Sequence, residues 1–208
     1  MRKGCFITLE GCEGVGKSTQ LGYLKEYLDG IDREVVYTRE PGGTPLAEKI
    51  RNLILTEEMD ALTEAYLFAT ARMEHINRVI LPALERGAVV LCDRYVDSSF
   101  AYQGFARGLG LKKVKEINFY ALENCMPDMT IFLDMDPRES FRKKSGKHID
   151  DDRMENETAE FHSRVYEGFK TLAREESHRY VCIVPQEDKK ETARLIRDAV
   201  EEGLKKCL

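Results

Sequence analysis

The eight residues from Gly11 to Ser18, Gly-Cys-Glu-Gly-Val-Gly-Lys-Ser, match the phosphate-binding pattern GxxxxGK[ST] at every specified position. They follow a short apolar segment that ends at Glu10 and precede a stretch with helical periodicity, which is the context that this pattern requires. The glycines allow the backbone to curl so that several N–H groups face one point. The positive end of the following helix dipole adds to their attraction for a phosphate. This feature favours an α/β fold that binds nucleotide phosphates; the alternative is a glycine-rich turn with a solvated lysine.

The residues of this motif form the expected nucleotide-binding set. Lys17 is expected to reach the β- and γ-phosphate oxygens, and Ser18 to offer its hydroxyl to Mg²⁺. A GTPase would also need an Asn-Lys-x-Asp sequence to read its base, and the chain contains none. The full set is Gly11, Cys12, Glu13, Gly14, Val15, Gly16, Lys17, Ser18 and Thr19, together with Arg142 further along the chain.

Short apolar runs alternate with helix-like segments along the whole chain. Predicted strands are 5–10, 34–38, 88–93, 130–134 and 180–184. Predicted helices are 62–86, 158–176, 192–206, one that ends at about Asp29, one that begins at Pro45 and a helical stretch between the third and fourth strands. The helix that begins at Pro45 is expected to bury Leu46, Ile50, Leu53 and Ile54, and Pro82 to bend the helix over 62–86. Strands that alternate with helices predict an α/β fold: a five-stranded parallel sheet flanked by helices, of the P-loop NTPase type.

Composition excludes several other classes of protein. A chain of 208 residues with 42% hydrophobic residues predicts a single domain over 1–208. The net charge of −5 argues against a nucleic-acid polymer as partner, and no apolar run approaches the ~18 residues of a membrane span. The N-terminus lacks the layout of a signal peptide, so we expect a cytoplasmic protein.

The six cysteines are scattered and fit neither a zinc-binding pattern nor a disulfide framework. Cys5, Cys92 and Cys182 lie in predicted strands and are expected to be small buried hydrophobes. Cys12 lies near a helix N-terminus, where the pKa of a thiol can fall, and is therefore a candidate for oxidation.

The segment 142–157 breaks the pattern of alternating strands and helices, because only Ile149 and Met154 are apolar in it. A segment of this kind cannot bury itself and predicts a mobile flap. Its cations include Arg142, Lys147 and Arg153. We interpret Asp150–Asp152 as a solvated loop rather than a metal site.

Asp93-Arg94-Tyr95 closes the third predicted strand. The carboxyl end of a parallel strand is where α/β sheets bind ligands, so Asp93 is expected to orient the water shell of the metal. Arg94 is placed to bind a second phosphate in a bidentate manner. The alternative is a structural Asp–Arg pair at a strand end.

Four segments together resemble the thymidylate kinases. They are Thr38-Arg39-Glu40-Pro41-Gly42-Gly43-Thr44, Leu67-Phe68-Ala69-Thr70-Ala71-Arg72, Asp93-Arg94-Tyr95 and Ser98-Ser99-Phe100-Ala101-Tyr102-Gln103-Gly104. The resemblance covers the whole chain in order. It implies a nucleoside-monophosphate kinase architecture and a homodimer. It also implies an enzyme that uses ATP and Mg²⁺ to convert dTMP to dTDP for dTTP synthesis.

The resemblance also implies roles for individual residues on the acceptor side. Phe68 would stack on the thymine ring, and Arg72, one helical turn later, would donate to a base oxygen. Ser99 and Gln103 would meet the other polar edge of the base. Tyr102 would pack under the sugar, where it would crowd a 2′-hydroxyl.

The remaining roles concern the phosphates. Glu13 would lie near the sugar 3′-hydroxyl and the acceptor phosphate, and Glu40 and Arg51 on the acceptor side. The resemblance implies that the flap belongs to a lid over ATP, at about 138–157. Gly14 stands where one subgroup of the family has a catalytic arginine, so the lid is expected to supply that cation. Arg153 matches the lid pattern best, with Arg142 and Lys147 as alternatives. The expected catalytic set is Lys17, Glu13, Arg94 and Arg153.

Two other functions remain open at this stage. One is a monophosphate kinase for dUMP, dGMP or a modified pyrimidine. The other is a nucleotide-binding module without turnover, against which the intact Lys17–Ser18 pair argues.

Overall fold

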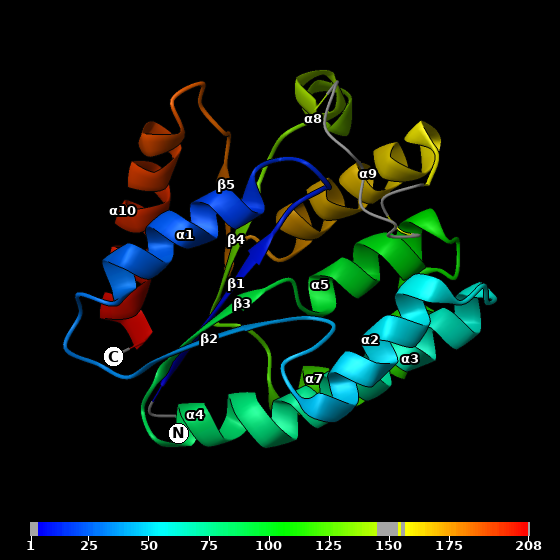
Figure 1. Ribbon diagram of the computed structural model, residues 1–208, viewed down its shortest axis with the longest axis horizontal. Helices are drawn as coiled ribbons and strands as arrows, with labels where there is room; N and C mark the ends of the chain where they lie inside the picture. The colour runs from blue at the N-terminus through cyan, green and yellow to red at the C-terminus, as the bar shows by residue number, and fades with distance from the viewer. Residues whose placement is uncertain (1–3, 145–153, 155–156, 208) are drawn as a thin grey trace.

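The computed structural model describes residues 4–144, 154 and 157–207. Within this part of the chain, five parallel strands form one sheet in the order β2-β3-β1-β4-β5 (Figure 1). The strands are β1 Cys5–Glu10, β2 Val35–Arg39, β3 Val89–Asp93, β4 Met129–Leu133 and β5 Tyr180–Ile183. The central strand β1 is buried along its whole length, and its carboxyl end leads directly into the glycine-rich loop. The predicted parallel α/β fold is confirmed.

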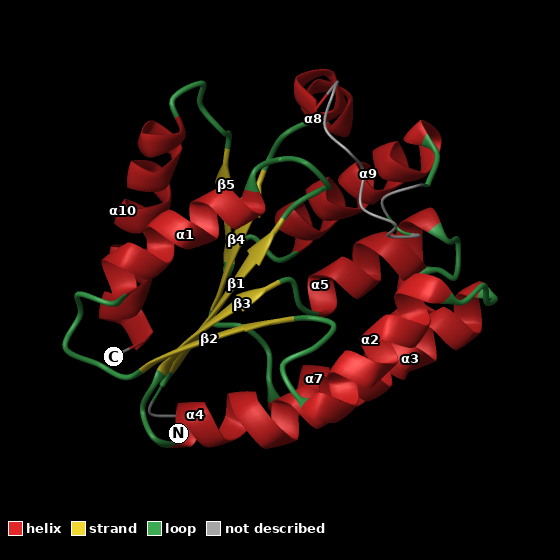
Figure 2. Ribbon diagram, in the orientation of Figure 1, coloured by secondary structure: helices red, strands yellow, loops and turns green. Residues whose placement is uncertain are grey.

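Helices cover both faces of the sheet (Figure 2). In Figure 1, α1 and α10 lie on one side, and α4, α5 and α9 lie on the other. The helical segments are α1 Lys17–Leu28, α2 Pro45–Thr56, α3 Ala61–His75, η1 Ile76–Ile80, α4 Leu81–Glu85, α5 Val96–Ser99, η2 Phe100–Ala106, α6 Leu111–Ile117, α7 Phe119–Asn124, α8 Pro137–Lys144, α9 Ala159–Glu175 and α10 Lys189–Cys207. The two η segments are π-helical. No helix in the described part of the chain is long and apolar enough to cross a membrane.

Local sequence explains where α2 and α3 begin. The Thr44 side chain accepts a hydrogen bond from the Ala47 N–H at 3.1 Å, and Pro45 occupies the first helical position, where a missing N–H does no harm. Asp60 caps α3 by accepting from the N–H groups of Leu62 and Thr63. Both caps precede helices that contribute residues to the site described below.

The buried face of α2 differs from the prediction. Leu46 and Leu53 are 50% and 47% exposed, whereas Ala47, Ile50 and Ile54 are buried. The helix packs against α3 through the small side chain of Ala47 and through Ile50 and Ile54. The i, i+3, i+7 spacing of these three residues defines a stripe rotated away from the two leucines.

One further prediction needs correction. Cys182 is exposed rather than buried, because β5 is an edge strand of the described sheet and this residue lies on its open side.

The helical stretch predicted over 62–86 is present in the structure from Ala61 to Glu85. The residues just before Pro82, Ile76–Ile80, form the π-helical turn η1 within it. Proline has no N–H to donate to the carbonyl four residues before it.

The predicted lid begins as helix α8, which extends to Lys144. Beyond it the structure describes Met154 and Glu157, and both contact Arg107: its Nη1 lies 2.5 Å from a Glu157 carboxylate oxygen, and its Nη2 lies 3.5 Å from the Met154 sulfur. Arg153, Lys147 and Asp150–Asp152 lie outside the described residues, as does the side chain of Arg142.

Candidate active site

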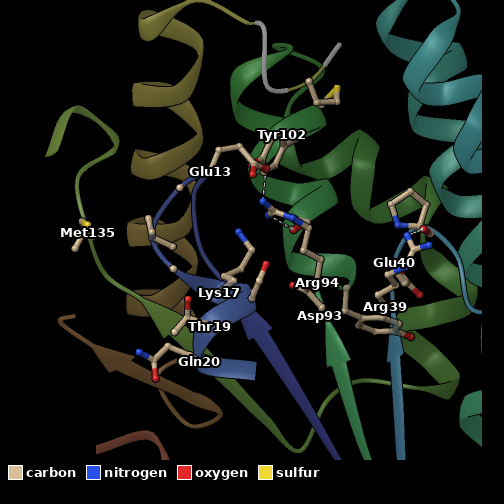
Figure 3. Close-up of a pocket in the computed structure, with 18 of the residues that line it drawn as sticks. Glu13, Lys17, Thr19, Gln20, Arg39, Glu40, Asp93, Arg94, Tyr102 and Met135 are labelled. Carbon is tan, nitrogen blue, oxygen red and sulfur yellow. Dashed lines mark hydrogen bonds and ion pairs between the residues drawn. The ribbon is translucent and has the colours of Figure 1, made fainter. Parts of the chain in front are cut away.

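A cavity of about 770 Å³ opens at the carboxyl ends of the strands (Figure 3). Volumes of this size suit ligands as large as nucleotides. The phosphate-binding loop, the loop after β2, helix α3, the Asp93-Arg94-Tyr95 turn and segment 185–192 all contribute to its wall. Side chains from distant parts of the sequence therefore face one space, as expected for a parallel sheet.

The phosphate-binding loop has the predicted geometry. Gly14 and Gly16 have φ values of 76° and 97°, a region that other residues rarely adopt, and α1 begins directly after Gly16. The Lys17 ammonium donates to the carbonyls of Gly11 at 3.0 Å and Cys12 at 2.9 Å. Burial lowers the pKa of Lys17 from its ordinary value. The lysine is thus a partly desolvated cation inside the loop, where its attraction for a phosphate is strengthened.

Glu13, Arg94 and Tyr102 meet on one side of the pocket (Figure 3). Arg94 pairs with the Glu13 carboxylate, and the Tyr102 hydroxyl donates to the same carboxylate at 3.0 Å. Burial acts to raise the pKa of Glu13, but the attraction of Arg94 and Lys17 outweighs it and lowers the pKa to about 2. Glu13 is therefore a carboxylate at neutral pH, and the cations around it offset the cost of an anion near phosphate-binding amides.

Arg94 is fixed by the protein at several points. Its Nη1 donates to the Gly11 carbonyl at 3.0 Å and to the Ser98 hydroxyl at 3.2 Å. Its φ of 63° is the one positive value at a non-glycine residue within the described chain. A strained backbone of this kind persists only where the surroundings hold it, and such positions cluster at functional sites.

Two oxygen-bearing side chains that suit Mg²⁺ lie at the end of β3 and the start of α1. Asp93 Oδ1 is buried and has no hydrogen-bond partner among the described residues, and Ser18 lines the same cavity. An unpartnered carboxylate oxygen near an exposed hydroxyl suits Mg²⁺, which prefers oxygen ligands and keeps several waters. The residues present therefore fit the metal.

The acceptor-side residues from α3 and the loop after β2 also come together. Arg72 is buried and donates through Nε to Glu40 at 2.7 Å and through Nη2 to the Tyr95 carbonyl at 3.2 Å. Arg51 donates to the Pro41 carbonyl at 3.2 Å. Glu40, Arg51, Phe68 and Arg72 all line the cavity. The structure thus brings together the loop after β2, helix α2 and helix α3, which are separate in the sequence.

Ser99, Tyr102 and Gln103 line the cavity from α5 and η2. The Ser99 hydroxyl is buried without a hydrogen-bond partner among the described residues, so a polar ligand group would satisfy it. The Gln103 amide donates to Glu64 at 2.9 Å, which fixes its orientation.

Cys12 does not fit the role predicted from its position. Its side chain is fully buried, and burial raises the pKa of the thiol to about 12 although Lys17 and Arg94 act to lower it. A buried thiol of this pKa is inert, so the prediction of oxidative sensitivity is wrong.

Glu10 holds the turn that carries Arg94, and sequence reasoning missed it. One of its carboxylate oxygens accepts from the N–H groups of Tyr95 at 2.8 Å and Ser98 at 3.3 Å, and the other accepts from the Ser98 hydroxyl at 2.7 Å. Ser98 in turn accepts from Arg94. The available signal was an acidic residue at the end of an otherwise apolar strand.

The wall formed by Pro185, Gln186, Glu187, Lys189 and Thr192 was also missed. It follows β5 and faces the P-loop helix, where Gln20 donates to the Lys189 carbonyl at 3.1 Å. The sequence signal is weak, because a polar turn after a strand is common.

In this cavity a phosphate-binding loop faces a second group of polar side chains, from α2, α3, α5 and η2. That arrangement is typical of kinases that transfer a phosphoryl group from one nucleotide to another. Comparison with known proteins narrows this class. The model of the thymidylate kinase family matches residues 9–196, and the chain belongs to that family.

Relatives and solved structures agree with this assignment. The chain is 45% identical over 206 residues to a thymidylate kinase of Shouchella clausii, with 97% of this chain and 95% of the relative aligned. It is 47% identical over 186 residues to a thymidylate kinase of Geobacillus thermodenitrificans, with 86% and 82% aligned. The crystal structure of thymidylate kinase from Ehrlichia chaffeensis superposes with a TM-score of 0.77 at 32% identity, over 95% of this chain and 98% of that one. The protein is therefore a kinase of the thymidylate kinase family.

Proposed function

We propose that this chain transfers the γ-phosphoryl group of ATP to dTMP, giving dTDP and ADP for dTTP synthesis, with Mg²⁺ as cofactor. The observation that carries this proposal is the position of Arg94, whose guanidinium contacts the P-loop carbonyl of Gly11 on one side and Ser98 on the other. It therefore lies between the loop that binds the donor phosphates and the residues expected to bind the acceptor.

The donor side consists of residues 11–19. The loop N–H groups and the Lys17 ammonium bind the β- and γ-phosphates, with Thr19 beside them. Ser18 and Asp93 would hold Mg²⁺ and its waters, and the ion would supply positive charge to offset that of the phosphates. The unpartnered oxygen of Asp93 supports this assignment.

The acceptor side binds dTMP. Phe68 stacks on the base, Arg72, Ser99 and Gln103 bind its polar edges, and Tyr102 contacts the sugar. The unpartnered hydroxyl of Ser99 supports a polar ligand at this point. Glu13, Glu40 and Arg51 complete the acceptor side.

The transfer itself needs no strong general base. The acceptor phosphate oxygen is already anionic at neutral pH, so alignment of the two phosphates and neutralisation of their charge do the chemical work. Lys17 and Arg94 supply positive charge from two directions, and Glu13 keeps Arg94 in place. A further lid cation remains a sequence-based expectation.

We also propose that the protein is a cytoplasmic homodimer. Large apolar side chains are exposed together on α3 and α7, which contact each other: Tyr66 and Met73 are 56% and 46% exposed, and Phe119 is 62% exposed. Clustered exposed apolar residues are typical of an interaction surface. Phe119→Arg is expected to convert a dimer to monomers in sedimentation equilibrium, whereas Val184→Arg, at another exposed apolar side chain, leaves the dimer intact.

The test of the activity is an initial-rate measurement of ADP formation with dTMP, dUMP and dGMP as separate acceptors, with and without Mg²⁺. The proposal expects turnover with dTMP above the other acceptors, and dependence on the metal. Equal rates with all acceptors would favour a broader monophosphate kinase. No turnover with any acceptor would favour a nucleotide-binding module.

A further inference from the structure

Three side chains with metal-binding atoms lie together where the strands begin, at the end of the sheet opposite the active site. Cys5 is the first residue of β1, Asp128 directly precedes β4, and Cys207 is the last residue of α10. Their two sulfur atoms and a carboxylate oxygen all lie within 4.8 Å of one another. In Figure 1 the start of β1 and the end of α10 lie on the same side of the molecule.

The carboxylate of this cluster is held by the neighbouring strand. The Phe6 N–H donates to Asp128 Oδ2 at 2.8 Å, and the Asp128 N–H donates to the Phe6 carbonyl at 2.9 Å. These two bonds orient Asp128 beside Cys5, which precedes Phe6. Hydrogen bonds of this kind orient metal-binding groups in known sites.

Close packing of α10 brings Cys207 to the same place. A Cβ atom at Gly203 would come within 2.2 Å of the Met129 Cε atom, so the Met129 side chain lies directly over this glycine and the helix is close to the start of β4. Gly203 and Cys207 are four residues apart and therefore share one face of the helix. The approach at Gly203 thus brings the helix end that carries Cys207 against the segment that carries Asp128 and Met129.

We propose that Cys5, Asp128 and Cys207 form a binding site for one Zn²⁺ ion. Zinc bonds of about 2.3 Å to sulfur and about 2.1 Å to oxygen place tetrahedral ligand atoms about 3.7 Å apart, so shifts of about 1 Å or less complete the site. Binding releases the protons of both thiols, because zinc binds the thiolate form. Water takes the fourth position, and the exposed Asp128 offers the ion a route from solvent.

The ligand set separates this site from the Mg²⁺ site of the kinase. Thiolates select zinc and other soft ions over Mg²⁺, which prefers oxygen ligands. The cluster lies at the amino ends of the strands, whereas the P-loop follows their carboxyl ends. Bound zinc would therefore link the start of β1 to the end of α10. It would stabilise the fold without taking part in phosphoryl transfer.

The experiment adds Zn²⁺ to the 208-residue protein, whose thiols are kept reduced by a phosphine. A chromophoric chelator competes with the protein for the ion and reports its affinity. Native mass spectrometry counts the bound ions, and Co²⁺ reports thiolate ligation by its charge-transfer absorption. The expected result is one Zn²⁺ per chain, with affinity lowered by about tenfold or more in Cys207→Ser and in Asp128→Asn. Cys182→Ser, which removes an exposed thiol elsewhere, is the matched control and keeps full affinity. Cys207→Ser should also keep wild-type kinase turnover.

Several outcomes would overturn the proposal. They are wild-type protein that binds no Zn²⁺, binding that Cys207→Ser and Asp128→Asn leave unchanged, or binding that Cys182→Ser abolishes. Reduced protein that binds no zinc, combined with a Cys5–Cys207 disulfide in oxidised protein, would assign the thiols a redox role instead.

Discussion

Glu10 offers the sharpest test of how the site is held in place, because its carboxyl is buried between β1 and the turn that carries Arg94. Burial is the main cause that raises its pKa, from an ordinary value of 4.5 to about 7, and the negative charge of Asp97 adds to the effect. Arg94, Ser98 and Tyr95 oppose it through charge and hydrogen bonds. The Glu10 carboxyl is therefore largely protonated in the folded protein at pH values where it is ionised in the unfolded chain.

The sign and size of the effect on stability follow from this difference. The folded state binds the Glu10 proton more tightly, so the contribution of Glu10 to stability is greatest below pH 4.5 and falls as the pH rises to about 7. The interval between the two pKa values corresponds to about 3 kcal/mol. Glu10→Gln keeps the shape and an oxygen acceptor for the N–H groups of Tyr95 and Ser98, but it has no proton to lose. The variant should therefore gain about 3 kcal/mol relative to wild type between pH 4 and pH 8.

Urea unfolding, followed by circular dichroism across this pH range, measures the effect. The slope of the unfolding free energy with urea should stay the same in both proteins, since the surface exposed on unfolding does not change. Glu58→Gln removes an exposed carboxyl and serves as the matched control, with no pH-dependent difference from wild type. A difference between wild type and Glu10→Gln that stays constant with pH, or that favours wild type as the pH rises, would refute the reasoning.

Three substitutions test the proposed active site. Lys17→Ala should lower kcat by about 10²-fold or more with an unchanged circular dichroism spectrum, and near-normal turnover would contradict the P-loop assignment. Phe68→Ala should raise the KM for dTMP by about tenfold, in line with ~1–3 kcal/mol for one stacked base, while the KM for ATP changes little; an equal rise in both would show that the acceptor pocket lies elsewhere. Tyr102→Ala should narrow the preference for dTMP over its ribose analogue, whereas Tyr102→Phe keeps the ring and the preference; unchanged discrimination in Tyr102→Ala would exclude contact with the sugar.

Strong local patterns allowed most of the fold to be predicted from the sequence. The run Cys5–Glu10 is a strand with the predicted bounds, and the other four predicted strands agree with the structure to within a residue at each end. Apolar runs that alternate with helical periods leave few other arrangements, since parallel strands need helical crossovers. The order of the strands was not predicted, because crossover lengths alone do not say which edge each new strand joins.

The buried faces of helices and strands were predicted less well than the positions of the helices and strands themselves. On α2, Leu46 and Leu53 fit a helical period as well as Ala47 does, and only the position of α3 decides between them. Cys182 shows the same limit in a strand, because burial of β5 depends on which neighbour covers each face. Periodicity identifies a stripe, but the partner element determines which stripe is buried.

The pKa values and spatial neighbours of the cysteines were harder still to predict than their places in strands and helices. Cys12 lies where a helix dipole and two cations lower the pKa of a thiol, yet burial outweighs both and raises it. Cys5 and Cys207 lie at opposite ends of the sequence, so their spacing gave no sign that the fold brings them together. Desolvation and long-range proximity both depend on the finished structure, and a local motif carries neither.

The arginines of the site show why its acidic residues were difficult to interpret from sequence. Glu13, which follows β1, pairs with Arg94, and Glu40, which follows β2, pairs with Arg72. A planar guanidinium with five N–H groups can bind a carboxylate on one side and still donate in another fixed direction, which an ammonium group cannot do. Each carboxylate thereby fixes the orientation of its arginine. At Arg94 this holds positive charge at the wall of the cavity before a substrate binds, and preorganised charge is the main source of stabilisation for a transferring phosphoryl group. In the proposed assignment, Glu13 therefore acts on phosphate recognition through Arg94, and Glu40 acts on recognition of the base through Arg72.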